Sequence, residues 1–337
     1  MPPAKKKNPT YDIISVGESL RDAFYTLYED TNSCTLDVDR LLLCLEYAEK
    51  IPIKDLVITK AAGNSANAAV GASRLELKSA LVTWVGKDSA GDDIRNALKE
   101  AGVDNQYVIV DPTNPTSEAA LLIYKGERTQ LVYFQPRKFR MPKLDKTRCI
   151  YYSAMGSKHA AFDKVLLKEV MKQPKAYFAF QPGTTHVRSG LEGLKPLIKR
   201  SDLFILNKDE SNDLLKDGKR TILNLLMTFH KFGAKTVIIT DGRNGADAYD
   251  GEDHWHMPIF NGKAKERTGA GDSFAIGVTS ALLKGKKLPE ALRWGTANSW
   301  SVVKQIGPQA GLLTTTEMNK VCKKYSKIKA ELITHKN

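Results

Sequence analysis

The sequence predicts an α/β fold, in which a mostly parallel central sheet carries helices on both faces and a small β unit projects from it. Short apolar runs alternate with longer amphipathic segments over most of the chain. This repetition of strand, helix and strand implies parallel strands joined by right-handed crossovers. A β-rich stretch within residues 119–134 breaks the alternation and is typical of a hairpin.

The expected strands of the main sheet are short apolar runs of the kind that is buried on both faces. They are Asp12–Gly17, Ser79–Gly86, Cys149–Met155, Lys175–Phe180, Asp202–Asn207 and Lys235–Thr240. Gly251–Phe260 is expected to add antiparallel strands at the other end of the sheet. Its two histidines, His254 and His256, would share one face of a strand, and we favour a surface strand there over a metal site.

Helices are expected between these strands, because the segments there repeat apolar residues every three or four positions. The clearest runs from Asp88 to Gly102. Further helices are expected at Val165–Lys172 and Ile222–Phe232, and a buried one after residue 272.

Two stretches depart from the alternation. Ala119–Tyr124 and Thr129–Phe134 are β-rich and are joined by residues 125–128, as in a hairpin. Residues Phe24–Lys60 are irregular, with one helix expected around Leu41–Ala48. Prolines within 112–115 and 136–142 are the expected hinges on either side of the hairpin.

The composition is that of an ordinary globular chain of 337 residues with a formal net charge of +13. The lysines are dispersed, and no aromatic residues interleave with them as in RNA-binding modules, so we expect no nucleic-acid partner. No apolar run is long enough to span a bilayer, and no membrane partner is expected. The four cysteines are scattered, which favours reduced thiols. Residues 1–10 are basic without a secretory apolar core, which predicts a disordered N-terminus and a cytoplasmic protein.

The most informative motif is the run of residues 266–272, Glu-Arg-Thr-Gly-Ala-Gly-Asp, which leads directly into the buried helix. A glycine turn at a helix start presents free backbone N–H groups and the positive end of the helix dipole, which suits phosphate. The carboxylate of Asp272 stands at the same place. An anion site beside a base is what phosphoryl transfer to an alcohol requires. The alternative is a helix start that Asp272 merely caps.

Further motifs occur along the chain at residues 16–22, 62–69, 86–92, 207–210, 240–245 and 307–312. With residues 266–272, they resemble in order the signatures of the PfkB or ribokinase-like carbohydrate kinases, which include ribokinase, fructokinase and nucleoside kinases. The resemblance extends from about residue 11 to about residue 325. Three departures stand out: Glu266 replaces an aspartate, Arg267 replaces a small hydroxyl residue, and Gln181 stands where many members have an acidic residue.

The resemblance implies the groups that would hold and activate the acceptor. Asp272 would be the general base. The anion hole would be formed by the backbone N–H groups of Gly269, Ala270 and Gly271. The substrate hydroxyls would be held by Asp22, Gly63 and Asn67. From the residues alone, Asp22 also fits a turn, and Asn67 fits a polar position in an alanine-rich helix.

The resemblance also implies a nucleotide side of the site. The residues that would contact ATP are Asn207, Thr240, Gly242, Gly245, Thr268 and Asn298. Magnesium would be held through water by Asn207 and Glu210. The alternative for that pair is a capping box, in which the glutamate side chain reaches back to the helix cap. Arg267 is placed to contact phosphates or to point to solvent, and the sequence favours neither.

The resemblance implies a three-layer ribokinase-like domain over residues 11–330, with a β lid formed by about 23–62 and 113–137. It implies an ATP-dependent kinase that uses Mg2+ and phosphorylates a primary hydroxyl of a sugar or nucleoside. A sugar-phosphate acceptor and a non-catalytic binding protein stay open as alternatives, and a homodimer through the lid is compatible with the family. The chain lacks a dinucleotide-binding Gly-x-Gly-x-x-Gly after its first strand and lacks a P-loop motif, which argues against a dehydrogenase and a P-loop kinase.

Overall fold

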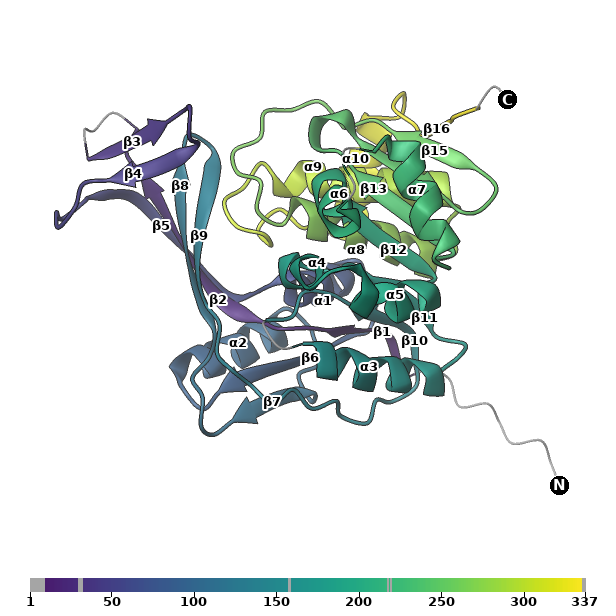
Figure 1. The fold of residues 1–337 in the computed structure, drawn as a ribbon, viewed down its shortest axis with the longest axis horizontal. Coiled ribbons are helices and arrows are strands. Elements are labelled where there is room, and N and C mark those ends of the chain that lie inside the picture. Colours follow the sequence, from purple (N-terminus) through teal and green to yellow (C-terminus); the bar gives the residue numbers. More distant parts are fainter. Residues whose placement is uncertain (1–9, 30–32, 157–158, 217, 219, 335–337) are drawn as a thin grey trace.

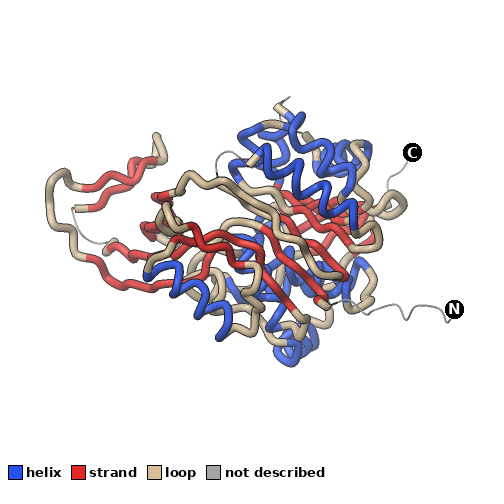
Figure 2. The backbone as a smooth tube through the Cα atoms, turned by 90° about the horizontal axis from the view of Figure 1, so that it is seen from below, coloured by secondary structure: helices blue, strands red, loops and turns tan. Residues whose placement is uncertain are grey.

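The computed structural model describes residues 10–29, 33–156, 159–216, 218 and 220–334, so that residues 1–9 of the predicted disordered terminus lie outside it. Its centre is a ten-stranded sheet with the order β16-β15-β14-β13-β12-β11-β10-β1-β6-β7. Helices cover both faces of this sheet (Figure 1, Figure 2). Neighbouring strands from β7 to β13 are parallel, and β14, β15 and β16 are antiparallel. The predicted mostly parallel α/β fold is confirmed.

Six strands of this sheet lie at the expected apolar runs, whereas the sequence did not predict the strands at Val108–Asp111, Ala246–Tyr249 and Glu331–Leu332. In chain order they are β1 (Tyr11–Val16), β6 (Ser79–Gly86), β7 (Val108–Asp111), β10 (Thr147–Tyr152), β11 (Tyr177–Phe180), β12 (Leu203–Asn207), β13 (Thr236–Thr240), β14 (Ala246–Tyr249), β15 (His254–Met257) and β16 (Glu331–Leu332). Gly251–Phe260 was expected to add antiparallel strands and supplies one of them, β15, which pairs with β14 and β16. Its two histidines share a face, and both rings bond to Asp247 of β14.

The helices are amphipathic or wholly buried, as their sequences predict. They are α1 (Asn64–Arg74), α2 (Ser89–Glu100), α3 (Ala160–Lys172), α4 (Thr184–Ser189), α5 (Leu191–Arg200), α6 (Lys208–Leu215), α7 (Ile222–Lys231), α8 (Ala270–Leu283), α9 (Leu288–Val302) and α10 (Thr315–Lys324). Ile14 and Val16 of β1 belong to the core layer that includes residues of α3, α5, α6 and α7, whereas Ile13 belongs to the layer that includes residues of α1, α8, α9 and α10. Successive residues of a strand point to opposite faces, so both layers draw their core from the same strands.

Two glycines set how closely α8 lies against α9. A Cβ placed on Gly277 would lie 2.9 Å from the Cα of Gly295. The two helix backbones therefore meet almost directly, which leaves no room for a larger residue at either position. This packing anchors α8, whose first turn carries the Gly-Ala-Gly-Asp motif.

A second, four-stranded sheet stands away from the main sheet (Figure 1). Its order is β5-β2-β8-β9, formed by β2 (Leu20–Leu27), β5 (Ile53–Ala62), β8 (Glu118–Tyr124) and β9 (Glu127–Tyr133). The predicted hairpin is confirmed as β8 and β9, with a turn at Lys125 and Gly126. Both turn residues have positive φ, 50° and 78°, which matches the twist of a tight hairpin.

The helix expected around Leu41–Ala48 is wrong. The segment forms β4 (Leu42–Leu45), which pairs antiparallel with β3 (Cys34–Asp37) at the far end of the second sheet. Leu41 and Ala48 have φ of 54° and 63°, so the backbone leaves the helical region on both sides of the strand. A short apolar run satisfies helix and strand patterns equally, and pairing with β3 decides between them.

Cys34, Cys44, Cys149 and Cys322 are all free of disulfide bonds. Within the residues that the structure describes, no helix combines the length and the apolar character needed to cross a bilayer.

Candidate active site

A cavity of about 660 Å³ lies where the second sheet meets the carboxyl ends of the parallel strands. Its walls come from β2, β8 and β9 on one side, and from the ends of β12 and β13 and the starts of α1, α4, α6 and α8 on the other. Ligands of open α/β sheets bind at this edge. The predicted residues that line it are Asp22, Gly63, Asn67, Asn207, Glu210, Thr240, Thr268, Gly269, Ala270, Gly271 and Asp272.

The turn before α8 requires glycine at position 269. Gly269 has a φ of 77°, and a Cβ there would lie 2.5 Å from the Cβ of Pro308. No side chain caps the start of α8. The amide of Ala270 donates to the carbonyl of Arg267 at 3.2 Å. Among the described residues, the amides of Gly269 and Gly271 have no such acceptor, so these two are the turn amides available to an anion.

Asp272 lies in the first turn of α8 and is almost fully buried, with 8% of its surface exposed. Its Oδ2 accepts a hydrogen bond from Asn67 Nδ2 at 2.8 Å, and its Oδ1 accepts one from Gln181 Nε2 at 3.4 Å. Burial raises the pKa of Asp272, while the bond from Asn67 and the charge of Arg128 oppose the rise. The side chain therefore lies among donors that favour the carboxylate, inside a site from which water is largely excluded.

Asp22 on β2 lies across the cavity, with 6% of its surface exposed. Its Oδ1 is buried and has no hydrogen-bond partner among the described residues. Burial, and next the charge of Asp272, raise the pKa of Asp22 from 3.8 to about 7. A buried oxygen without a hydrogen-bond partner destabilises the folded protein unless a ligand supplies the hydrogen bond.

The start of α1 supplies the third part of the acceptor side. Gly63 precedes the helix with a φ of 99°, and a Cβ there would lie 2.6 Å from the carbonyl oxygen of Glu18. Asn67 follows one turn later and is buried. Its Oδ1 accepts from Gln309 Nε2 at 2.9 Å, which turns its amide nitrogen to Asp272.

Asn207 and Glu210 form the capping box that was the alternative interpretation. Glu210 N donates to Asn207 Oδ1 at 2.8 Å, and Asn207 N donates to Glu210 Oε2 at 3.2 Å. Both residues also line the cavity. Burial raises the pKa of Glu210. Because the cap uses one carboxylate oxygen and leaves the other without a hydrogen bond among the described residues, capping and ligand binding are compatible.

Three predicted nucleotide contacts lie outside the cavity lining. Gly242 begins a single 3-10 turn after β13, and Gly245 follows that turn. The residue before it, Asp241, pairs with Lys208 at 2.9 Å. Asn298 is fully buried in α9. Its Nδ2 donates to the carbonyl of Ser273, and its Oδ1 accepts from Leu313 N. Its amide thus ties α9 to α8, and the geometry gives no support to a contact between this side chain and ATP.

The sequence alone left the role of Arg267 undecided and indicated no role for Gln181 or Gln309. Arg267 lines the cavity and forms an ion pair of 2.8 Å with Glu127 of β9, so it links the α8 turn to the second sheet. Gln181 directly follows β11, and a polar residue at the end of a parallel strand is the signal that would have found it. Gln309 lies in a loop and gave no comparable signal.

One group of three among the described residues could in principle hold a metal, namely His159, Asp163 and His186 at the starts of α3 and α4. The Nδ1 atom of His186 accepts from Gly183 N, so a neutral ring carries its hydrogen on Nε2, beside the hydroxyl of Tyr152. Burial lowers the pKa of His186 and favours that neutral ring. With both ring nitrogens occupied, the group is a hydrogen-bonded network that holds the start of α4.

Comparison with known proteins shows the family to which the chain is related. The model of the pfkB family carbohydrate kinases matches residues 31–315. The chain is 26% identical over 312 residues to an ATP-dependent 6-phosphofructokinase of Thermoanaerobacterium thermosaccharolyticum, covering 88% of this chain and 89% of that protein. It is 24% identical over 302 residues to a ribokinase of Staphylococcus aureus, covering 85% and 96%.

Solved structures with the same fold cover nearly the whole chain. Arabidopsis thaliana ribokinase, complexed with ribose and ATP, has a TM-score of 0.74 at 20% identity and covers 94% of this chain and 99% of its own. A nucleoside kinase of Methanocaldococcus jannaschii, an archaeal member of the ribokinase family, has a TM-score of 0.71 at 23% identity, with 93% and 99% covered. The fold is that of ribokinase. Since the family model spans most of the sequence, the chain belongs to the pfkB family of carbohydrate kinases and is a phosphotransferase.

Proposed function

We propose that the protein transfers the γ-phosphoryl group of ATP to a primary hydroxyl of a sugar or nucleoside, with Asp272 as the general base. One observation carries the proposal: Asp272, Asp22 and Asn67 line the same cavity as the uncapped start of α8. A base, a holder of hydroxyls and an anion site then meet around one volume. Phosphoryl transfer needs little else, because positioning and charge stabilisation supply most of the catalysis.

Asp272 would accept the proton of the acceptor hydroxyl as its oxygen attacks the γ-phosphorus. The bond from that oxygen to phosphorus forms while the bond from phosphorus to the bridging oxygen of ADP breaks. The free amides of Gly269 and Gly271 would donate to the oxygens of the transferring group. Preorganised donors of this kind are worth roughly 3–4 kcal/mol each in related sites.

Asp22 suits the recognition of sugar hydroxyls. A group with a pKa of about 7 is a carboxylate in some molecules and a carboxylic acid in others at neutral pH, so it both accepts and donates hydrogen bonds. Its buried Oδ1 lacks a partner in the described protein. A hydroxyl of the acceptor would supply that partner.

The residues fit a hydrated magnesium ion that accompanies ATP. The carboxylate oxygen of Glu210 that the cap leaves free, together with the side-chain amide of Asn207, offers the hard oxygen atoms that magnesium prefers, and both residues line the cavity. When bound, magnesium neutralises charge on the phosphates. Thr240 and Thr268 would contact the nucleotide from the ends of their elements.

A sugar-phosphate acceptor is the second candidate, and Arg128 favours it. This arginine lies on β9, lines the cavity and makes no ion pair among the described residues, yet its charge acts on both Asp22 and Asp272. The relative named as a 6-phosphofructokinase agrees with this candidate. The non-catalytic alternative has less support, because the base and the anion turn are both intact.

An ATP-consumption screen tests the proposal and separates the candidates. The acceptors are ribose, fructose, adenosine, guanosine, cytidine and fructose 6-phosphate, each with ATP and magnesium. Turnover on a free sugar or nucleoside supports the first candidate, and turnover on the sugar phosphate alone supports the second. Silence on every acceptor would contradict both and favour a binding protein.

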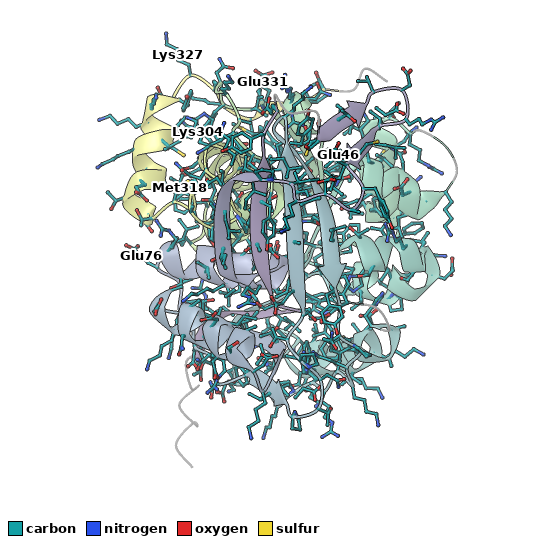
Figure 3. All side chains as sticks on the ribbon, turned by 90° about the vertical axis from the view of Figure 1, so that its left-hand side faces the viewer. Glu46, Glu76, Lys304, Met318, Lys327 and Glu331 are labelled. Atoms are coloured by element: carbon teal, nitrogen blue, oxygen red, sulfur yellow. The ribbon has the colours of Figure 1, made fainter. Side chains whose placement is uncertain are left out.

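We also propose a homodimer through the outer face of the second sheet. Strand register aligns Ile58, Ala23, Ala120 and Leu131 in one row across β5, β2, β8 and β9. Ile58 is 53% exposed and Leu131 is 58% exposed. The opposite face of β9 lines the cavity. Figure 3 looks at this side of the molecule, where the broad face of the sheet occupies the centre of the view. A second copy of the chain would cover it.

A further inference from the structure

Asp272 is held by two side-chain amides that come from different elements. Asn67 of α1 donates to Oδ2 at 2.8 Å, and Gln181, at the end of β11, donates to Oδ1 at 3.4 Å. The two oxygens of one carboxylate thus each have a neutral donor. A carboxylate held at both oxygens has a fixed plane, whereas a single bond leaves it free to rotate.

Each amide is in turn held at its oxygen end. The hydroxyl of Tyr151 donates to Gln181 Oε1, and Gln309 Nε2 donates to Asn67 Oδ1 at 2.9 Å. An amide that accepts at its oxygen must present its nitrogen elsewhere, so both nitrogens turn to Asp272. Burial raises the pKa of Tyr151 well above its ordinary value, so its hydroxyl keeps the proton that it donates.

The charges around Asp272 explain why such donors matter. Asp22 of β2 and Glu210 of α6 are acids whose pKa values its charge raises, and the charge of Arg128 on β9 opposes the rise in the pKa of Asp272 itself. Among the described residues, the buried carboxylate thus interacts with the charges of two acids and one arginine. Two uncharged donors favour the ionised form without adding a cation that would compete for phosphate.

We propose that Gln181 is a positioning residue for Asp272: held at its oxygen by Tyr151, it donates to Oδ1 opposite Asn67 and fixes the plane of the carboxylate for the acceptor hydroxyl. The inference rests on the proposed role of Asp272 as base. It assigns a role to the position where the sequence departs from the family, since an acid there would face Asp272 with a like charge.

The test measures the titration of Asp272 itself. Aspartate is labelled with 13C at Cγ, and the Asp272 signal is identified by its loss in Asp272→Asn. In Gln181→Met the apparent pKa of Asp272 is expected to rise by about half a unit to one unit, because one donor to the carboxylate is lost. In Gln181→Glu it is expected to rise by about one unit or more, because a like charge replaces the donor.

A matched control separates positioning from folding. Gln173 is also a glutamine whose amide bonds at both ends, to Thr147 N and to the carbonyl of Asp145, and it lies at the end of α3 outside the cavity lining. Gln173→Met is expected to leave the Asp272 titration unchanged. Circular dichroism checks that each variant is folded.

Two results would overturn the inference. One is an Asp272 titration that stays at the wild-type value in both Gln181 variants while they are folded. The other is a shift as large in Gln173→Met, which would mean that general loosening moves the titration. Failure of the proposed function looks different: Asp272→Asn would then keep wild-type turnover whatever the titrations of the Gln181 variants show.

Discussion

At the scale of single residues, the site concentrates acids that burial disfavours. Asp272 and Asp22 are both nearly buried, and each raises the electrostatic cost of the other. A bound ligand can place a hydroxyl group between the two acids and hydrogen-bond to both. Without a ligand, the two buried acids lower the free energy of unfolding, as is common at functional sites.

The pKa of Asp22 predicts a stability change with a definite sign. Its value rises from 3.8 to about 7 on folding, so the contribution of this group is complete below about pH 4 and is lost as pH rises through 7. The shift corresponds to a loss on the order of 4 kcal/mol. Asp22→Asn does not titrate, so its free energy of unfolding is expected to exceed that of the wild type by a few kcal/mol at pH 8 and by little at pH 4.

Urea unfolding at the two pH values measures this difference. Asp39→Asn, a change at an exposed aspartate between β3 and β4, is the control and is expected to alter neither value. Equal stability of Asp22→Asn and the wild type at pH 8 would be inconsistent with a strongly raised pKa. The variant is also expected to have a higher KM for the acceptor, because it loses the carboxylate.

Glu210→Gln separates the capping role from the proposed metal role. Glutamine at this position still accepts from the Asn207 amide, so the capping box and the fold are kept. The lost charge weakens the hold on magnesium, and the magnesium concentration for half-maximal turnover is expected to rise roughly tenfold. A magnesium titration that overlays the wild-type curve would leave Glu210 with capping alone.

Residue types at motif positions were predictable, but contacts between distant residues were not. The sequence pointed to Asp22, Asn67 and Asp272 through a family resemblance, and the structure brings all three to one cavity. The resemblance also implied a nucleotide contact for Asn298, but its side-chain amide donates to the carbonyl of Ser273 and accepts from the amide of Leu313. A pattern in one segment cannot reveal which distant backbone group will occupy a buried amide.

At the scale of elements, the α8 turn and the second sheet are physically linked. The ion pair between Arg267 and Glu127 joins a residue two positions before Gly269 to the first residue of β9. A movement of the β8–β9 hairpin would therefore change the length of an ion pair that lies next to the start of α8. The sequence could identify both elements, but their contact depends on how the second sheet folds over the cavity.

Gly269→Ala tests the anion turn as an element. A Cβ at this position would meet Pro308 at 2.5 Å and require a positive φ, so the turn must shift. Turnover is expected to fall by about tenfold to a hundredfold, since the donors move away from the phosphoryl group. Gly193→Ala in α5 is the matched control, because a Cβ there meets nothing within 4 Å. It is expected to keep its turnover and to gain about 0.5–1 kcal/mol of stability. Equal turnover in the two variants would argue against the anion turn.

Six strands of the main sheet, β1, β6 and β10 to β13, were predictable because their apolar runs are buried on both faces and bounded by turns. The segment Leu41–Ala48 was not, because an apolar run of that length fits either type of element. Its conformation is decided by pairing with β3 and by the positive φ of the residues that flank it. Local pattern fails where a partner strand, rather than a local preference, provides the hydrogen bonds.

At the scale of the whole molecule, the second sheet has one face over the cavity and one apolar face outside. Only the register of its strands reveals this division, since Gln130 and Val132 line the cavity while Leu131 between them points outward. An exposed apolar row of this kind predicts association. The dimer and the cavity would then share β2, β8 and β9.

Ile58→Asp tests the association. A charge at this end of the apolar row must be desolvated on dimer formation, which costs several kcal/mol. Sedimentation equilibrium is expected to give a dimer for the wild type and a monomer for the variant. Val165→Asp, on the exposed face of α3, is the control and is expected to stay dimeric. A monomeric wild type at micromolar concentration would contradict the dimer.

The most direct measurement of the central claim compares turnover and ATP binding in Asp272→Asn. The substitution keeps the size of the side chain and removes the base. Turnover on the acceptor found by the screen is expected to fall roughly 10²- to 10⁴-fold, while the dissociation constant for ATP, measured by calorimetry, stays within about threefold of the wild type. Turnover near that of the wild type would contradict the role of Asp272 as the base and, with it, the proposed chemistry of the site.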